Sequence, residues 1–266
     1  MERISSRQNA LVRQFRQVAQ GDIEDALLLD GNHLIEEALT SGVTVDVAAF
    51  GERLATSALA MRLHDAHTRV VVVSDVVLDA MSPVQSPSGS VAIARRPAAS
   101  LDRVLAKRPE LVLLLHDVQD PGNVGAVVRA AEGCGATGVV CSERTADPFG
   151  WKALRGAMGS SFRMPLAVRQ SLLQAIAAAR TRGVRVYAAT ARGGAPLPEC
   201  DLHVPAAIML GGEGGGLPDE LVAAADARLT IPMQAPVESL NVAIAAALVI
   251  YEAARQRQTR GVHVAL

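Results

Sequence analysis

Apolar and polar positions in the first part of the chain follow two periods in turn. Short runs of consecutive apolar residues alternate with stretches in which apolar residues recur every three or four positions. The first pattern predicts buried strands and the second predicts amphipathic helices. The predicted strands span residues 26–30, 43–50, 69–74 and 91–94, and the predicted helices span 8–19, 31–40, 53–67 and 75–81. This alternation favours an α/β domain with a mostly parallel sheet.

The apolar pattern breaks over residues 95–109, a stretch that contains two prolines and five basic residues. A break of this kind predicts a boundary between two domains. We therefore assign residues 1–98 to a smaller N-terminal domain, 99–106 to a linker and 107–266 to a C-terminal domain.

The C-terminal domain opens with the run LVLLL at 111–115, which is typical of a strand buried on both faces of a parallel sheet. The strands predicted after it span 137–141, 162–168 and 184–190, and a further strand begins at Ile208. The predicted helices span 124–134, part of 147–159, 172–182 and an alanine-rich stretch after residue 241. The second domain is therefore also predicted to be α/β.

The composition adds a constraint on the core and leaves the ligand open. The chain has 266 residues, half of them hydrophobic and only 3% aromatic, so valine, leucine, isoleucine and alanine must fill the core. The net charge of −1 argues neither for nor against nucleic acid. Of the 26 basic residues only Lys107 and Lys152 are lysines. This arginine bias fits either a GC-rich genome or the recognition of phosphates by guanidinium groups.

Several classes of protein are disfavoured. The three cysteines show no CxxC spacing, which favours structural thiols in a reducing compartment. The six histidines are scattered without ligand spacing, so no metal site is expected. No apolar run reaches membrane-spanning length and no signal peptide precedes the first domain. We expect a cytoplasmic protein without a membrane partner.

The most unusual stretch is GGEGGG at 211–216, in which five glycines surround one acid, Glu213. It lies between an apolar strand and a second short strand. A flexible turn is the simple explanation, but an idle turn rarely needs so many residues that lose extra entropy on folding. The P-loop and GxGxxG patterns are both absent, so this is not one of the common phosphate-binding loops. We interpret it as a loop that faces a ligand.

Four further polar residues stand at the starts of predicted helices or inside one. Asn123, Ser239 and Asn241 can each be explained as helix caps. Arg129 lies among small apolar residues that offer it no obvious partner, so it is either a surface residue or points into a cleft. A capping role and a ligand-binding role are compatible, because a helix N-terminus presents donors to whatever lies there.

Candidate contacts to nucleic acid come from two places. The first twenty residues carry Arg3, Arg7, Arg13 and Arg16 against one acid, which fits a solvated helix face or a nucleic-acid contact equally well. In the predicted helix within 147–159, we expect the single tryptophan, Trp151, to pack in the core. Its neighbours Lys152 and Arg155 are candidate contacts to RNA phosphates.

Three segments, in this order, resemble the motifs of the SpoU (TrmH-like) RNA 2′-O-ribose methyltransferases of the SPOUT superfamily. They are DPGNVGAVVRAA at 120–131, LGGEGGGLP at 210–218, and the stretch from IPM at 231 through SLNV at 239–242 into the alanine-rich helix. The segment GSSFRMP at 159–165 is similar to another recurrent family segment. The likeness covers most of residues 111–257. In the N-terminal domain, 27–39 and 89–97 resemble the L30e-like substrate-binding domain of the members that act on ribosomal RNA.

The resemblance implies an α/β fold whose C-terminal SPOUT domain contains a deep trefoil knot, beside an L30e-like α/β domain. It implies S-adenosyl-L-methionine as cofactor and a homodimer formed through the C-terminal domain. The implied activity is 2′-O-methylation of a ribose in RNA, with 23S ribosomal RNA as the expected target and no binding of DNA. The alternatives are a tRNA 2′-O-methyltransferase and a non-catalytic RNA-binding relative. A nucleotide-dependent oxidoreductase would need a phosphate fingerprint that is absent.

The resemblance also implies roles for individual residues. The catalytic or site-forming positions would be Asn123, Arg129, Glu213, Ser239 and Asn241. The cofactor would contact, mainly through backbone, Thr190, Leu210, Gly211, Ile231, Met233 and Leu240. We expect RNA to be bound by Arg7, Lys152 and Arg155.

The expected chemistry leaves the role of Arg129 open. A ribose 2′-hydroxyl is a poor nucleophile that must lose its proton as it attacks the methyl group, and in-line positioning supplies much of the rate. The family proposal is that Arg129 activates this hydroxyl. A guanidinium is a reluctant base, since its pKa lies above about 12. Arg129 could instead hold a phosphate and the 2′-oxygen and so lower the proton affinity of the hydroxyl. Glu213 could accept from Asn123 or from a nucleotide.

Overall fold

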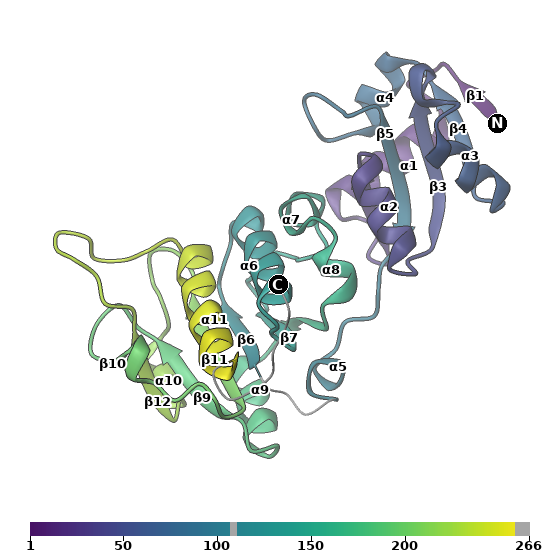
Figure 1. Cartoon of the computed structure of the whole chain (residues 1–266). Coiled ribbons are helices and arrows are strands. Elements are labelled where there is room, and N and C mark those ends of the chain that lie inside the picture. Colours follow the sequence, from purple (N-terminus) through teal and green to yellow (C-terminus); the bar gives the residue numbers. More distant parts are fainter. Residues whose placement is uncertain (107–110, 259–266) are drawn as a thin grey trace. The chain divides into compact units, whose positions relative to one another are not determined.

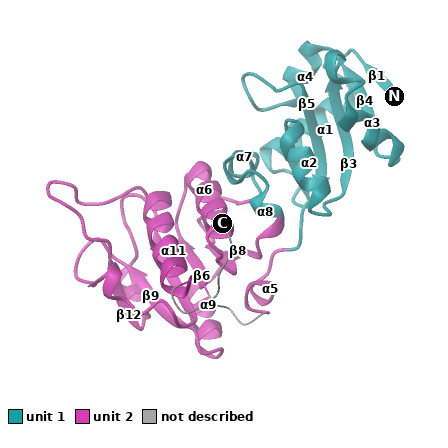
Figure 2. Ribbon diagram, in the orientation of Figure 1, with its two compact units in different colours: residues 1–98, 149–162 teal, residues 99–148, 163–266 magenta. Residues whose placement is uncertain are grey.

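The structure, a computed structural model, describes residues 1–106 and 111–258 (Figure 1). It divides into two compact units. Unit 1 comprises Met1–Ala98 with Phe149–Phe162, and unit 2 comprises Ala99–Pro148 with Arg163–Leu266 (Figure 2).

Unit 1 is built on a five-stranded sheet in the order β1-β4-β3-β5-β2. The strands are β1 (Glu2–Ile4), β2 (Ala26–Asp30), β3 (Val45–Gly51), β4 (Arg69–Val73) and β5 (Ser90–Arg95). β4 pairs in parallel with β1 and β3, whereas β5 pairs antiparallel with β2 and β3. This mixed sheet corrects the expected mostly parallel one, because the apolar pattern of a buried strand is the same whichever way the chain runs.

The helices of unit 1 are α1 (Ala10–Gln20), α2 (Asn32–Thr40), α3 (Ala58–Asp65), α4 (Asp75–Met81) and α7 (Trp151–Ala157), with a short 3₁₀ turn at Glu52–Leu54. The helix expected over 53–67 is thus split in two. One part of the core joins α1 and α4 to the sheet through Phe15, Val12, Val77 and Val71. Trp151 packs against this cluster, and α7 packs on β2. Residues 149–162 therefore belong with unit 1, although the expected boundaries assigned them to the C-terminal domain.

Unit 2 contains a seven-stranded sheet in the order β10-β12-β9-β11-β6-β7-β8, and every neighbouring pair is parallel. The strands are β6 (Leu111–His116), β7 (Gly138–Ser142), β8 (Leu166–Gln170), β9 (Arg185–Ala189), β10 (Ala195–Pro196), β11 (Ala206–Gly211) and β12 (Ala227–Thr230). The central strands β6 and β11 are buried apart from their last residue, as expected for a parallel sheet covered on both faces.

The helices of unit 2 are α5 (Leu101–Leu105), α6 (Pro121–Gly133), α9 (Leu172–Arg180), α10 (Asp219–Ala223) and α11 (Val242–Gln258), with a 3₁₀ turn at Leu197–Glu199; α8 (Ser160–Arg163) lies where the two units meet along the chain. The segment expected to be a linker, 99–106, thus contains a helix, and Val104 and Leu105 of that helix are buried in the core of unit 2. The strand expected over 162–168 begins later, at Leu166, because α8 precedes it.

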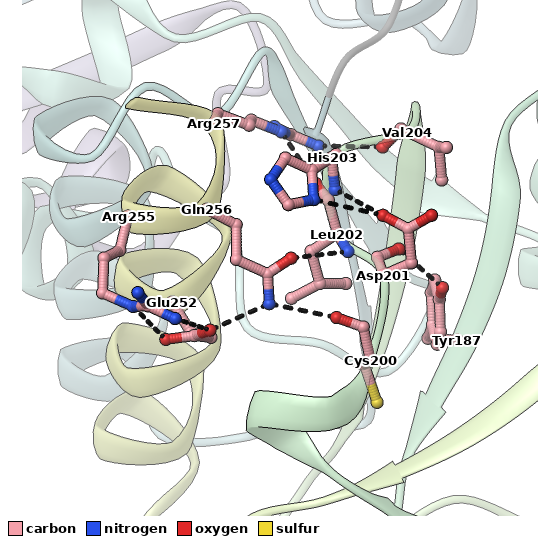
Figure 3. Close-up of polar contacts among 10 residues, drawn as sticks. All are labelled: Tyr187, Cys200, Asp201, Leu202, His203, Val204, Glu252, Arg255, Gln256 and Arg257. Carbon is pink, nitrogen blue, oxygen red and sulfur yellow. Dashed lines mark hydrogen bonds and ion pairs between the residues drawn. The ribbon is translucent and has the colours of Figure 1, made fainter. Parts of the chain in front are cut away.

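Hydrogen bonds join the C-terminal end of α11 to the segment that leads into β11 (Figure 3). The side chain of Gln256 is 6% exposed; it accepts a hydrogen bond from the Leu202 N–H (2.9 Å) and donates one to the Cys200 carbonyl (3.0 Å). Arg257 donates to the carbonyls of Leu202 and Val204. These bonds satisfy backbone groups that lie outside any sheet, so they fix the position of α11 on unit 2.

Within 1–106 and 111–258, none of the helices combines the length and the apolar character that crossing a bilayer requires.

Candidate active site

The expected site lies at the carboxyl edge of the parallel sheet in unit 2. β6 ends at His116 and β11 ends at Gly211, and these two residues are register partners. The Gly212 N–H then donates to the His116 carbonyl (2.8 Å), so the glycine loop starts directly beside the loop that leads to α6. Open parallel sheets bind ligands at this edge. The edge is therefore where convergent polar groups should be sought.

Two glycines are required here by close approach of backbone. A Cβ added to Gly212 would lie 2.6 Å from the carbonyl carbon of Asp117, and one added to Gly211 would lie 2.6 Å from the backbone nitrogen of Leu217. Real Cβ atoms essentially never come so close to backbone. At Gly212 the loops after β6 and β11 therefore touch through main chain, and at Gly211 the glycine loop folds back on its own start, with no room for a side chain at either position.

A chain of side-chain hydrogen bonds links three loops at this edge. The Asn123 Nδ2 donates to the Glu213 carboxylate, and the Asn241 Nδ2 donates to the Asn123 Oδ1 (3.1 Å). Asn123 stands in the first turn of α6, Glu213 in the glycine loop and Asn241 just before α11. Three residues that lie far apart in the sequence, one from each of the three motif segments, are thus brought together.

Local capping leaves these side chains available. The cap of α6 is Asp120, whose carboxylate accepts from the Asn123 N–H (2.8 Å). The Asn123 side chain, which could have been an N-cap itself, is therefore free to reach Glu213. Asn241 has both roles at once, since its Oδ1 accepts from the Ala243 N–H (2.9 Å) while its Nδ2 reaches Asn123.

The remaining two expected catalytic residues are not joined to this chain of bonds. Arg129 is exposed on α6, and it makes no hydrogen bond or ion pair with any residue in the described ranges. Ser239 is also exposed, and its hydroxyl has no hydrogen-bond partner in the described part of the chain. Both groups are thus available to a ligand.

Of the expected cofactor contacts, three stand next to strand ends. Thr190 follows β9 and its N–H donates to the Leu229 carbonyl (2.9 Å), Gly211 ends β11, and Ile231 follows β12. Met233 and Leu240 lie in the segment between β12 and α11, and they are half-buried, as Ile231 is. The side chain of Leu210 is almost fully buried in the core, so it can shape the site only from behind.

These residues fit S-adenosylmethionine. A nucleoside cofactor with an alkyl sulfonium needs partly exposed apolar surface beside free backbone groups at an open edge. Ile231, Met233 and Leu240 supply the apolar surface. A Cβ added at Gly214, Gly215 or Gly216 would meet nothing within 4 Å, so the outer part of the glycine loop faces open space.

A second polar cluster, which the sequence did not single out, supports the loop after β6. Asp117 has a left-handed backbone (φ 51°), and its N–H donates to the Ser142 Oγ (3.0 Å). The Arg144 guanidinium lies 3.4 Å from the Asp117 carboxylate, and the Thr145 hydroxyl donates to the Leu115 carbonyl. The sequence signal that could have revealed this cluster is the polar stretch that directly follows the buried strand at 111–115. The cluster fixes the backbone that Gly212 touches.

The cysteine of β7 beside this cluster is a structural thiol. Burial, together with the negative charge of Asp147, raises the pKa of Cys141 to about 12, so the thiol stays protonated and unreactive. Among the residues that the structure describes, no group of histidine, cysteine and acidic side chains is arranged to hold a metal ion.

The expected RNA contacts Arg7, Lys152 and Arg155 belong to unit 1 and are all exposed. Arg7 precedes α1, and the other two lie on α7, where the Lys152 ammonium stands 5.4 Å from the ring centroid of Trp151. Trp151 packs against the core cluster of unit 1 but is only partly buried, so the prediction that it lies in the core is confirmed only in part.

Comparison with known proteins shows which family this chain is similar to. Residues 110–251 match the SpoU rRNA Methylase family. The chain is 32% identical over 255 residues to the 23S rRNA (guanosine(2553)-2′-O)-methyltransferase RlmP of Bacillus subtilis, which covers 94% of this chain and 98% of that protein.

Solved structures match over a similar extent. The SpoU methyltransferase AviRb from Streptomyces viridochromogenes, in complex with AdoMet, has a TM-score of 0.86 at 26% identity over 95% of this chain and 99% of that one. The AdoMet-bound rRNA methyltransferase from Sinorhizobium meliloti has a TM-score of 0.85 at 28% identity, over 96% and 97% of the two chains. The family match spans more than half of the sequence, and the relatives align over nearly all of it. The chain therefore belongs to the SpoU rRNA methylase family.

Proposed function

We propose that this protein is an S-adenosylmethionine-dependent RNA methyltransferase that methylates a ribose 2′-hydroxyl in 23S ribosomal RNA. The observation that carries the proposal is the hydrogen-bonded chain Glu213–Asn123–Asn241, which gathers all three motif segments at the carboxyl edge of the sheet. A relative that aligns with nearly the whole chain, unit 1 included, is named for this reaction on 23S rRNA. This full-length likeness favours ribosomal RNA over tRNA.

The cofactor site consists of Thr190, Leu210, Gly211, Ile231, Met233 and Leu240. When bound, S-adenosylmethionine supplies an activated methyl group on its sulfonium. The half-buried Ile231, Met233 and Leu240 exclude water from one side of the site. The glycine loop brings backbone donors and acceptors close to the ligand without intervening side chains.

The polar chain positions the reacting ribose. Glu213 accepts from Asn123 through one carboxylate oxygen, and its other oxygen makes no hydrogen bond within the described residues, so it can accept from a nucleotide. Asn241 and Ser239 stand at the N-terminus of α11, where backbone N–H groups favour an anionic or polar ligand. Fixed groups of this kind hold the hydroxyl in line, which supplies much of the rate of methyl transfer.

Arg129 acts as a cation rather than as a base. Its guanidinium has no partner in the described ranges, and a guanidinium donates hydrogen bonds but does not take up a proton near neutral pH. By holding a phosphate next to the target ribose and the 2′-oxygen itself, it stabilises the negative charge that develops as the hydroxyl loses its proton to solvent water and its oxygen takes the methyl group.

The C-terminal unit contains a deep trefoil knot in this proposal. β11 lies between β9 and β6, the chain then continues to β12 beyond β9, and it returns as α11 to pack on α6. The tight backbone contact between Gly212 and Asp117 is what a threaded loop would require. The smaller unit 1 is the L30e-like domain that presents RNA to this site.

The enzyme acts as a homodimer that meets through α11. Ile244, Leu248 and Tyr251 are 54%, 42% and 62% exposed, and their spacing of four and three residues places them on one face of the helix. An apolar stripe on the longest helix of the unit suits a twofold contact between two copies. The protein works in the cytoplasm, where its three free cysteines stay reduced.

The test is incubation of the purified protein with labelled S-adenosylmethionine and total RNA, followed by mapping of the label. We expect label on one ribose 2′-oxygen of 23S rRNA, and saturable binding of the cofactor by calorimetry. Label on a base, or cofactor that does not bind, would refute the proposal.

Arg129→Lys and Arg129→Ala distinguish the roles of that residue. If the bidentate hydrogen bonds of the guanidinium are needed, both variants lose activity to the same extent. If the lysine variant keeps part of the activity and its pH–rate profile is shifted, residue 129 acts as a base.

A further inference from the structure

Unit 1 has a hollow of about 440 Å³ that no part of the proposed active site uses. Its wall comes from the segment before α1, from α1 itself, from the end of α4 and from the start of α7. The lining side chains that matter are Arg7, Arg16, Gln20, Asp79 and Trp151. The volume lies in the range of sites that bind small molecules or single nucleotides.

The arginines of the hollow have donors to spare. Arg7 is exposed, and it makes no hydrogen bond or ion pair with any described residue. The Arg16 Nε donates to the Ala80 carbonyl (2.8 Å), which holds the guanidinium in place. Its two terminal nitrogens have no partner within the described residues. One anchored guanidinium and one without a partner in the described residues therefore line the same hollow, which suits a phosphate group.

The aromatic wall is formed by Trp151. It is the only tryptophan in the chain, and it both packs against the core cluster of unit 1 and lines the hollow. The neighbouring Lys152 ammonium lies 5.4 Å from the ring centroid and adds positive charge beside the ring. A rigid aromatic surface flanked by cations is the usual platform for stacking an unpaired base.

The hollow is also lined by one carboxylate, that of Asp79. Asp79 forms no hydrogen bond or ion pair in the described part of the chain. A carboxylate disfavours a bare anion, so the hollow is poorly suited to free phosphate or to an acidic peptide. It is well suited to accept a hydrogen bond from the amino or imino group of a nucleobase.

We propose that this hollow binds one unpaired nucleotide of the RNA substrate. The base lies against Trp151 with a donor edge toward Asp79, and Arg7 and Arg16 hold its phosphate. The site is separate from the methyl-transfer site of unit 2 and rests on the proposed function, because it assigns to unit 1 a contact with a splayed-out base of the same RNA. Proteins read RNA sequence mainly at such unstacked bases.

The single tryptophan makes the proposal directly testable. Titration of the full-length protein with a short single-stranded RNA, at one fixed salt concentration, should quench the fluorescence of Trp151 in a saturable way. Inorganic phosphate, an acidic peptide and duplex RNA of the same length should leave it nearly unchanged. Saturable quenching by the peptide, or equal quenching by the duplex, would overturn the proposal.

Arginine variants provide the second readout and avoid disturbing the core. Arg7→Gln and Arg16→Gln should each weaken the binding measured by quenching about tenfold, as expected for the loss of a hydrogen bond to a charged group. The matched control is Arg13→Gln, because Arg13 is an exposed arginine of the same helix α1 that does not line the hollow. An equal loss in all three variants would show a general charge effect and would overturn the site.

Failure of this inference and failure of the proposed function give different results. If the wild-type protein methylates RNA but RNA leaves the Trp151 fluorescence unchanged, only the nucleotide site is wrong. If the protein binds no S-adenosylmethionine but RNA quenches the fluorescence and Arg7→Gln weakens the effect, only the proposed methylation is wrong.

Discussion

The glycine loop offers a sharp test of how the site is built. In Gly212→Ala the new methyl group would lie 2.6 Å from the Asp117 carbonyl carbon, whereas ordinary contacts begin near 3.4 Å. The Asp117 carbonyl oxygen would be closer still, so the backbone must move by more than the 0.8 Å between these two distances, since no flexible side chain is involved. Either the loop after β6 or the glycine loop has to move, and with it Asn123 or Glu213. Overpacking of this kind costs about 1–3 kcal/mol of stability, and a displacement near 1 Å costs about 100-fold in rate.

The control lies three residues away in the same loop. A Cβ at Gly215 would meet nothing within 4 Å, and the backbone there is not left-handed, so Gly215→Ala should fold and melt as the wild type does. Methyl transfer from labelled S-adenosylmethionine, cofactor calorimetry and thermal unfolding are measured for both variants. Gly212→Ala should lose about 100-fold in methyl transfer and melt a few degrees lower. Wild-type rates in Gly212→Ala, or an equal loss of thermal stability in Gly215→Ala, would refute the close-contact argument.

Three further experiments test other parts of the molecule. Glu213→Gln should keep cofactor binding but lower the methylation rate at least tenfold, measured by single-turnover transfer, because the carboxylate that orients the site is lost. Gln256→Leu leaves a buried backbone N–H without an acceptor and should lower the free energy of unfolding by about 1–3 kcal/mol in urea titration, whereas the exposed Gln258→Leu should change it by less than about 0.5 kcal/mol. Alkylation followed by mass spectrometry should label the half-buried Cys134 well before Cys141, whose pKa burial raises to about 12, and equal rates would contradict that.

Local pattern was sufficient for most of the elements. The predicted strand 26–30 and the predicted helix 75–81 coincide with β2 and α4, because a short apolar run and a serine–aspartate helix start are unambiguous signals. The convergence of the three motif segments could also be anticipated, since they follow strands whose carboxyl ends share one edge of a parallel sheet.

Some features of the fold could not be predicted from the local sequence pattern, because they depend on contacts between residues that lie far apart in the sequence. The direction of β5 is set by its pairing with β2 and β3 and not by its own residues. The segment 149–162 lies between strands of unit 2 in the sequence, yet Trp151 packs against the core of unit 1. The stretch 101–105 has the charges of a linker, but Val104 and Leu105 find an apolar surface in unit 2 and form a helix there.

The chemical identity of the site residues follows from a competition that the structure resolves. A residue at a helix start can use its side chain to cap the helix or to build a site, and Asn123 is released for the site because Asp120 does the capping. Glu213 can only accept, so Asn123 must turn its amide nitrogen toward it and its oxygen toward Asn241. Asn241 must then donate to Asn123 with its nitrogen and accept from the helix with its oxygen, which a carboxylate could not do. Each amide is thus used at both ends, and replacement of either by aspartate would place an unpaired acceptor against an acceptor. This polarity explains why the two loops that meet the acidic glycine loop carry asparagine.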